Sequence, residues 1–266
     1  MSSQLNKYLS ISFINIKESL TYIWDIIFGK VIFIALIIFV FANLWTVVFA
    51  SKGEVIPGFT LAMMVWYLVF GEAIITSIGR FVKEVGDDIK SGEIANYLTK
   101  PYNYIVYKMF VSFGKGLINF TLILIFGGLV AYLMVGGVEI SLISIPFLLI
   151  VALLAMLLNL VIASVISLFA FWIEDASSLN YIYSKFTFIF GGMIVPLEVY
   201  PPLVEKIASF LPFSYSAYHP SKLALIFSFE SFFKVFLVQI AWISFFIIIL
   251  IFFYKYIIKK VSVNGG

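Results

Sequence analysis

The sequence predicts an all-α membrane protein whose chain crosses the bilayer six times. Of its 266 residues, 63% are hydrophobic and only 12% are charged, whereas soluble globular domains have about 45–50% apolar and about 25% charged residues. The mean hydropathy of +1.11 points the same way. No stretch left between the long apolar runs could bury a core of its own, so residues 1–266 are predicted to form a single transmembrane domain.

Composition also excludes several kinds of chemistry. Cysteine is absent and His219 is the single histidine, so we expect no disulfide framework, thiolate nucleophile or histidine-based metal site. We interpret His219, which precedes Pro220, as structural. The sequence also lacks the G-x-x-x-x-G-K-[S/T] motif that cradles nucleotide phosphates. The chain is therefore not expected to be an enzyme, to hold catalytic, cofactor-binding or metal-ligating residues, or to bind nucleic acid.

Residues 4–28 are predicted to form an amphipathic helix that lies in the membrane interface. Apolar residues recur at steps of three or four, and polar residues fall mostly elsewhere on the helical wheel. The apolar positions are Leu5, Leu9, Phe13, Ile16, Leu20, Ile23 and Ile27. A helix with this pattern can lie flat on a membrane. The alternative is a helix that packs on other helices of the protein.

Six apolar runs approach the roughly 20 residues that a helix needs to cross a hydrocarbon core about 30 Å thick. The fifth run is barely long enough, and Pro146 suits the first position of the fourth helix. The predicted spans are residues 31–50, 58–78, 110–135, 146–172, 179–195 and 232–258. Lysine and arginine concentrate in the segments on the same side as the N-terminus, which predicts that both termini are cytoplasmic.

Between the second and third spans, residues 82–101 are predicted to form a cytoplasmic loop that contains a short helix. Ser91 is a plausible N-cap for this helix, and Pro101 stops it. Ile94, Tyr97 and Leu98 share one of its faces. Such a helix could dock on a soluble partner. It could equally be a solvated connector whose apolar residues touch the membrane surface.

This loop carries a family resemblance. DDIKSGEIANYLTKPYN, residues 87–103, resembles the intracellular loop of ABC-2 type transporter permeases, in particular prokaryotic six-span permeases that work beside a separate ATPase. FIFGGMIVPLEVYPPLVEKIASFLPFSY, residues 188–215, is similar to the family's pattern of Gly-Gly, Pro, aromatic-Pro and Leu-Pro-Phe. The resemblance covers nearly the whole chain, although only these two stretches are specific.

The resemblance implies a permease subunit of an ABC exporter in a prokaryotic cell membrane. The chain would form half of the translocation pathway with a second permease, identical or homologous. Two separate ABC ATPase subunits would bind ATP and Mg²⁺, so this chain needs no cofactor. The transported substrate is left open, and export rests on analogy with the family. The alternative is a secondary transporter or channel that needs no ATPase, for which Glu72 is the candidate ion-coupling carboxylate.

The resemblance also implies roles for particular residues. Residues 4–28 would be a connecting helix at the interface, and residues 196–231 would re-enter the membrane as short outer helices. The fifth span would break at Gly191, Gly192 and Pro196; freed backbone at membrane depth must be satisfied by protein or water. The coupling helix, which would sit in a groove of the ATPase, comprises Asp88, Ile89, Gly92, Glu93, Ile94, Tyr97 and Leu98.

Three charged residues, Glu72, Lys115 and Lys185, lie within predicted spans, where such side chains are costly and often functional. Glu72 and Lys115 are both predicted near the cytoplasmic side and could form an ion pair. Alternatively, Lys115 extends its amine to the inner interface. Lys185, near mid-membrane, could line a cavity that attracts an anionic substrate, or it could bind the carbonyl groups freed around Gly191 and Gly192.

Overall fold

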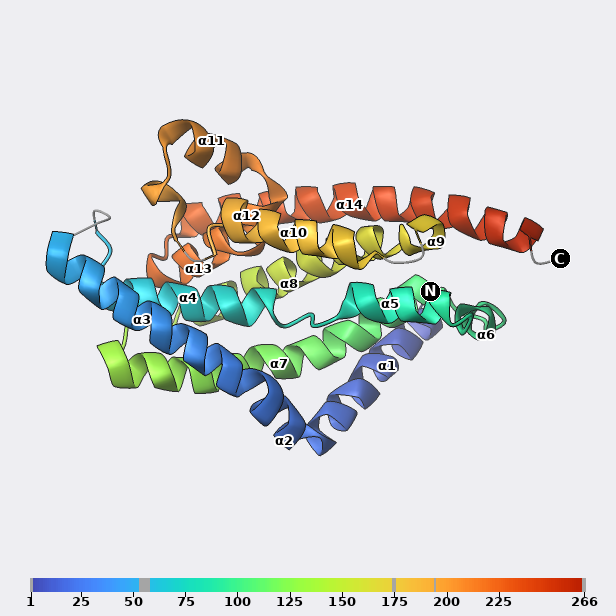
Figure 1. The fold of residues 1–266 in the computed structure, drawn as a ribbon, viewed down its shortest axis with the longest axis horizontal. Coiled ribbons are helices and arrows are strands. Elements are labelled where there is room, and N and C mark those ends of the chain that lie inside the picture. The colour runs from blue at the N-terminus through green and yellow to red at the C-terminus, as the bar shows by residue number, and fades with distance from the viewer. Residues whose placement is uncertain (1, 53–57, 174–175, 194, 265–266) are drawn as a thin grey trace.

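The protein is a long helical bundle, seen in a computed structural model that describes residues 2–52, 58–173, 176–193 and 195–264. Both termini and α6 lie at one end of the bundle, while α11, α13 and the C-terminal end of α7 lie toward the other (Figure 1). The described residues form only helices, turns and loops. The elements are α1 (Ser2–Thr21), α2 (Ile23–Ile26), a π-helical turn (Ile27–Val31), α3 (Ile32–Lys52), α4 (Leu61–Ile75), α5 (Phe81–Lys90), α6 (Ile94–Leu98), α7 (Tyr104–Val135), α8 (Ile145–Ser167), α9 (Ala170–Ile173), α10 (Ser177–Phe190), the 3₁₀-helix η2 (Leu197–Val199), α11 (Pro202–Phe210), α12 (Pro212–Ser216), α13 (Tyr218–Leu225) and α14 (Phe229–Asn264).

Four of the six predicted spans are long, apolar helical stretches in the described part of the chain. They are Ile23–Ser51, Tyr104–Val135, Ile145–Ile173 and Phe229–Ile257. The predicted second and fifth spans are shorter, because α4 has 15 residues and α10 has 14. At a rise of 1.5 Å per residue, each covers about 22 Å, less than a hydrocarbon core of about 30 Å. Within the described residues, four helices are therefore long and apolar enough to cross a membrane. Whether α4 and α10 also cross it stays a prediction.

The chain between α4 and α6 differs from the predicted loop. Thr60 caps α4 by accepting a hydrogen bond from the Met63 amide at 3.2 Å, but α4 ends at Ile75, three residues before the predicted end of the second span. A turn with Gly79 at a φ of +73° follows, and the chain then forms a helix again. This helix, α5, lies beyond the end of α4 along the bundle (Figure 1).

Helix α5 is part of the bundle because one of its faces is apolar. Phe81, Val82 and Val85 are buried in the same core as α4, α7 and α8. Its opposite face holds the exposed residues Arg80, Lys83, Glu84, Asp87 and Lys90. The spacing of these apolar residues at i, i+1 and i+4 indicates a helix. The prediction for this loop contained only one short helix and so missed α5.

The N-terminal helix α1 packs along the first half of α7. Ser12 Oγ donates a hydrogen bond to the Phe110 carbonyl at 2.6 Å, and the Asn103 amide donates to Tyr8 Oη at 3.1 Å. The rings of Tyr8 and Phe110 stack at 5.3 Å. The alternative interpretation, packing on another helix, therefore holds. The predicted apolar positions Leu9, Phe13 and Leu20 nevertheless point outward, each at least 49% exposed, so the location of α1 at a membrane interface stays a prediction.

The close approach of α1 to α7 requires a glycine at position 114. A Cβ atom there would lie 2.6 Å from the Ser12 carbonyl oxygen, and backbone cannot rotate away from such a contact. We expect Gly114→Ala to separate the two helices at a cost of about 1–3 kcal/mol and to increase amide hydrogen exchange across residues 2–21. The control is Gly86→Ala on α5, where an added Cβ meets no atom within 4 Å. Unchanged exchange in the Gly114 variant would contradict this packing.

The short helices α12 and α13 insert between the long helices at the end of the bundle away from the termini. Gln239 of α14 is fully buried, and its Nε2 donates hydrogen bonds to the Tyr215 carbonyl at 2.9 Å and the Val151 carbonyl at 3.1 Å. These bonds connect α14 to α12 and α8. A Cβ added at Gly71 of α4 would lie 3.5 Å from Ser221 Oγ of α13. The insertion agrees with a re-entrant arrangement, although its membrane depth stays a prediction.

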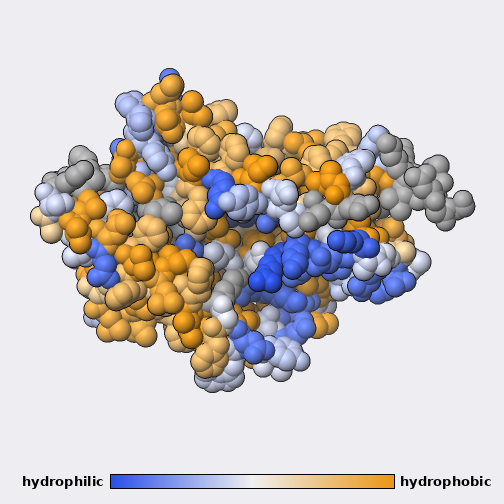
Figure 2. Space-filling model, in the orientation of Figure 1, coloured by the Kyte–Doolittle hydropathy of each residue, from blue (hydrophilic) through white to orange (hydrophobic). Residues whose placement is uncertain are grey.

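The surface of the bundle is apolar over most of its length. Hydrophobic side chains cover much of the visible face, and hydrophilic side chains gather over α5 and the neighbouring part of α1 (Figure 2). On α3, the side chains of Phe33, Leu36 and Phe39 are 62%, 58% and 52% exposed. Exposed apolar area of this extent marks a surface in contact with lipid or another apolar partner. The protein is therefore embedded in a membrane through its long helices.

Candidate functional site

The predicted coupling segment covers the end of α5, a tight turn and α6. The two helices and the turn, residues 81–98, are called the α5–α6 hairpin, and they lie at the end of the bundle that holds the termini (Figure 1). Gly92, at a φ of +75°, turns the chain between the two helices. Ser91 was predicted as the N-cap of α6, but it is the C-cap of α5. The N-cap position of α6 is occupied by Glu93, whose backbone is helical. The segment predicted as one short helix is thus two helices with a tight turn between them.

The apolar face of α6 packs inward, toward the rest of the protein. Ile94 is buried, and Tyr97 and Leu98 are half-buried against the same core as α5 and α7. The Tyr97 ring lies 5.3 Å from that of Tyr104 and 5.7 Å from that of Tyr107. Ile89 also packs partly on this core. These four predicted coupling residues therefore pack at least partly on the rest of this chain.

Asp88 fixes the hairpin to the start of α7. Its Oδ2 accepts a hydrogen bond from Tyr104 Oη at 2.6 Å and forms an ion pair with Lys108 Nζ at 2.6 Å. The side chains of Lys108 and Asp88 are only 13% and 11% exposed, so this is a largely buried pair. Lys108 Nζ also lies 5.4 Å from the centre of the Tyr97 ring, within cation–π range. These contacts join the end of α5 to the first turns of α7.

The surface that the hairpin exposes is polar. Gly92, Glu93, Asn96 and Lys100 are exposed along the turn and the outer face of α6, and they continue the charged face of α5. Of the predicted coupling residues, only Gly92 and Glu93 lie on this surface. The docking role of all seven stays a prediction.

Glu72 and Lys115 do not form the predicted ion pair. Among the described residues, ion pairs join Lys108 to Asp88 and Lys222 to Glu198. Glu72 is 3% exposed within α4, while Lys115 is half-buried on α7, between two glycines that approach α1 and Ser77 closely. The two residues lie on adjacent helices, but packing directs their charged groups to different surroundings.

Lys185 lies on the outward face of α10. Its side chain is exposed, and its Nζ lies 4.8 Å from the centre of the Tyr181 ring and 5.7 Å from that of Phe188. No hydrogen bond from Lys185 to a backbone carbonyl occurs among the described residues, and the Gly192 carbonyl accepts one from Tyr67 Oη. The lining of a cavity by Lys185 stays a prediction.

A cavity of about 340 Å³ lies behind α10, between the α4–α5 turn and α8. Asn159 of α8 and Tyr183 of α10 meet there, with Tyr183 Oη donating to Asn159 Oδ1 at 2.6 Å. Asn159 is 5% exposed, and its Nδ2 has no hydrogen-bond partner in the described structure. The wall also includes Arg80, Asn180, Ser184 and Thr187. A ligand with a hydrogen-bond acceptor could satisfy the Asn159 amide here.

The break after α10 falls where the sequence predicts it. Helix α10 ends at Phe190, and Gly192 adopts a φ of +58°. A Cβ at Gly191 would lie 3.1 Å from the Phe213 carbonyl, and one at Gly192 would lie 3.0 Å from Leu197, so both conformation and space favour glycine. Pro196 then precedes η2. Ile194, within the predicted fifth span, lies outside the described residues.

Beyond the break, a polar network joins η2 to α13. Glu198 Oε1 accepts hydrogen bonds from Tyr218 Oη at 2.6 Å and from Lys222 Nζ. Partial burial alone would raise the pKa of Glu198, but the hydrogen bonds from Lys222 and Tyr218 outweigh it, and the pKa is lowered. The network therefore favours the ionised form of Glu198, and the ionised carboxylate in turn stabilises the folded protein.

Replacing Glu198 by glutamine is expected to destabilise the protein most at neutral pH. Because its folded pKa is depressed, the carboxylate contributes stability above its unfolded pKa of about 4.3, and this contribution is lost as the pH falls through the folded pKa. Lys222 is 37% exposed in this pair, so we expect a loss of about 1 kcal/mol, or about 3 °C in melting temperature. Thermal unfolding should show this difference at pH 7 and its disappearance in acid. Glu205→Gln on α11 is the control; an equal effect there would contradict the assignment.

Two buried amide side chains, those of Asn159 and Gln239, were missed from the sequence. Each stands alone in an apolar run, and a lone amide within a span is the signal that could have identified them. Asn159 has an unsatisfied amide at the cavity, whereas Gln239 connects helices. These roles differ because packing places different neighbours around the two side chains.

One family of known proteins matches the chain over most of its length. The sequence model of the ABC-2 family transporter proteins matches residues 31–263, from the start of α3 almost to the end of α14. The chain belongs to this family. A search of curated proteins found no match. As an ABC-2 family transporter protein, the chain is a membrane-embedded permease subunit, and its matched region includes the α5–α6 hairpin, the cavity and the break after α10.

Proposed function

We propose that this chain is the permease subunit of an ATP-driven exporter and that the α5–α6 hairpin is its docking element for a separate ATPase. The observation that carries the proposal is the construction of the hairpin. Its outer surface is polar and exposed at Glu93, and its inner surface is fixed to α7 through Asp88. An element that is accessible on one side and rigidly attached on the other is suited to transmit motion.

The energy for transport comes from the partner in this proposal. The chain has no P-loop sequence, so two ATPase subunits would bind ATP and Mg²⁺ and close on each other. Their movement would displace the hairpins and, through Asp88 and Lys108, the α7 helices. Both termini share the end of the bundle that holds the hairpin (Figure 1), and we propose that this end is cytoplasmic in a prokaryotic cell membrane.

A second permease subunit, identical or homologous, would complete the pathway. The outward face of α10 exposes Tyr181, Ile182, Lys185, Phe186 and Ile189, a mixture of one cation and large apolar groups. We propose that this face lies opposite the second subunit and that substrate passes between them. Under this arrangement Lys185 lines the pathway and favours substrates with negative charge.

Purification of the complex from its native membrane tests the function. The expected result is a complex in which this permease is accompanied by a P-loop ATPase, with ATP hydrolysis and with ATP-dependent accumulation of substrate in inverted vesicles. The alternative is a secondary transporter, for which buried Glu72 without an ion pair is the candidate coupling group. Transport by the purified chain alone, driven by a proton gradient and abolished by Glu72→Gln, would contradict the proposal in favour of that alternative.

A further inference from the structure

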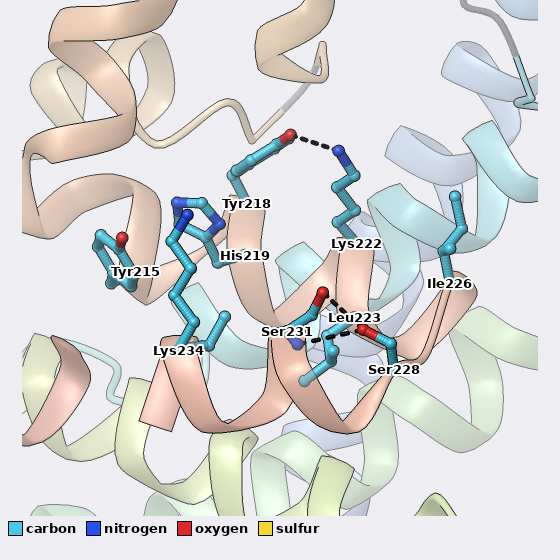
Figure 3. A pocket seen from close by; sticks show the side chains of 10 residues that line it. Tyr215, Tyr218, His219, Lys222, Leu223, Ile226, Ser228, Ser231 and Lys234 are labelled. Atoms are coloured by element: carbon cyan, nitrogen blue, oxygen red, sulfur yellow. Dashed lines mark hydrogen bonds between the residues drawn. The ribbon is translucent and has the colours of Figure 1, made fainter. Parts of the chain in front are cut away.

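A pocket of about 250 Å³ lies at the end of the bundle away from the termini, between α13 and the start of α14. Figure 3 shows its polar side chains: Tyr215, Tyr218, His219 and Lys222 from α12 and α13, Ser228 just before α14, and Ser231 and Lys234 from α14. This pocket is separate from the α5–α6 hairpin and from the cavity behind α10. Its lining contains no acidic residue.

The two lysines of the pocket differ in their partners. Lys222 Nζ donates hydrogen bonds to Glu198 and to Tyr218 Oη. Lys234 is exposed and forms no ion pair with any described residue. The charge of Lys222 is balanced by Glu198, so the pocket offers one unbalanced positive charge, on Lys234.

Uncharged polar groups complete the pocket. His219 Nε2 is buried without a hydrogen-bond partner in the described structure, and the ring stacks on that of Tyr215 at 4.2 Å. Burial lowers the pKa of His219 to about 4, so the imidazole is neutral at pH 7 and adds no second charge. Tyr215 also lines the pocket, and no hydrogen bond to its hydroxyl occurs among the described residues. A buried polar group without a partner is costly unless a ligand or water supplies one.

An exposed apolar stripe begins next to Lys234 and runs down α14. Leu237 is 62% exposed, Phe245 51%, Ile248 54% and Phe252 71%. These residues follow Lys234 at steps that keep them on one face of the helix. Lys234 lies five residues from the start of α14 at Phe229, about 7.5 Å along its axis, which is a suitable depth for a headgroup at the membrane boundary.

We propose that the pocket binds the phosphate of an anionic phospholipid, whose acyl chains lie along the stripe on α14. One free ammonium group matches the single negative charge of a phosphodiester, and the phosphate oxygens are strong acceptors for Lys234 and the Tyr215 hydroxyl. A headgroup hydroxyl, such as that of phosphatidylglycerol, satisfies His219 Nε2. Free phosphate is also an anion with strong acceptor oxygens, but it leaves the stripe beside the pocket without an occupant, so the geometry favours the lipid.

Lipid titration of the purified full-length protein, followed by native mass spectrometry, tests the proposal. Phosphatidylglycerol and phosphatidylcholine with the same acyl chains are compared for the wild type, Lys234→Gln and Lys206→Gln. Lys206, on α11, is also exposed and forms no ion pair with a described residue, but it lies outside the pocket. We expect Lys234→Gln to weaken phosphatidylglycerol binding about tenfold, the loss of one charge-assisted hydrogen bond. Lys206→Gln should retain wild-type affinity. Phosphatidylcholine, whose choline cation offsets the phosphate charge, should bind the wild type more weakly than phosphatidylglycerol and lose less affinity on Lys234→Gln.

A second variant separates loss of binding from loss of folding. Tyr215→Phe removes only the hydroxyl, and it should weaken phosphatidylglycerol about threefold to fivefold while the ring keeps its stacking on His219. Equal weakening by Lys206→Gln, or equal affinity of the wild type for the two lipids, would overturn the proposal. Inorganic phosphate that displaces the lipid at equimolar concentration would overturn the lipid assignment and leave a site for free phosphate.

Discussion

Reversing the charge at position 93, Glu93→Arg, is expected to weaken binding of the ATPase to the permease by at least about tenfold. Glu93 is the exposed acidic residue at the turn of the α5–α6 hairpin, so its replacement changes the docking surface without altering the core. A charge of the wrong sign at an interface costs several kcal/mol, and tenfold corresponds to only about 1.4 kcal/mol. The measurement is the affinity of the detergent-solubilised permease for its ATPase, together with ATP hydrolysis by the complex.

The same substitution at Glu139 provides a matched control. Glu139 is exposed in the loop between α7 and α8, at the opposite end of the bundle from the hairpin (Figure 1). Glu139→Arg should leave ATPase affinity and coupled hydrolysis at the wild-type level. If Glu93→Arg also binds the ATPase as tightly as the wild type, the hairpin is not the docking element.

Removing the carboxylate of Asp88 by Asp88→Ala is expected to destabilise the protein by about 3 kcal/mol or more. The change leaves the Lys108 ammonium largely buried without its counter-charge, and an uncompensated buried charge is far more costly than a missing surface pair. It also removes the acceptor for the Tyr104 hydroxyl. Chemical denaturation in detergent, followed by loss of helical signal, measures the change in the free energy of unfolding.

A double substitution distinguishes the ion pair from simple packing. Asp88→Leu combined with Lys108→Met replaces both charges by apolar groups, and it should restore most of the lost stability because neither desolvated charge remains. We expect this variant to fold and to retain the hairpin. If the double variant is as unstable as Asp88→Ala, the stabilisation comes from another property of Asp88.

The sequence predicted the break after α10 because it depends on local backbone conformation. Gly191 and Gly192 in an apolar run, followed by Pro196, cannot continue a helix favourably, and the helix ends there. The N-terminal position of Pro146 in α8 follows from the same local rules. The long apolar helices α3, α7, α8 and α14 were likewise predictable from the length and hydropathy of their runs.

Other features depended on contacts between distant residues and were predicted poorly. The periodicity of residues 94–98 correctly gives a helix with an apolar face, but it does not say whether that face contacts the core or a partner. In the structure, Tyr104 and Tyr107 of α7 lie beside Tyr97, so this face packs at least partly on the rest of the chain. Similarly, Glu72 and Lys115 are close in predicted depth, but depth does not determine which side of a helix faces its neighbour.

By itself, the sequence determined that this protein is a helical membrane permease, where its long helices lie and where the fifth is interrupted. These properties follow from hydropathy, helix length and the backbone preferences of glycine and proline, all of which act locally. Only the tertiary structure decided which charged groups are paired and which surfaces stay free. Asp88 is paired with Lys108, while Lys234 forms no ion pair within the described part of the chain, because the partner of a charge is set by which helices pack together.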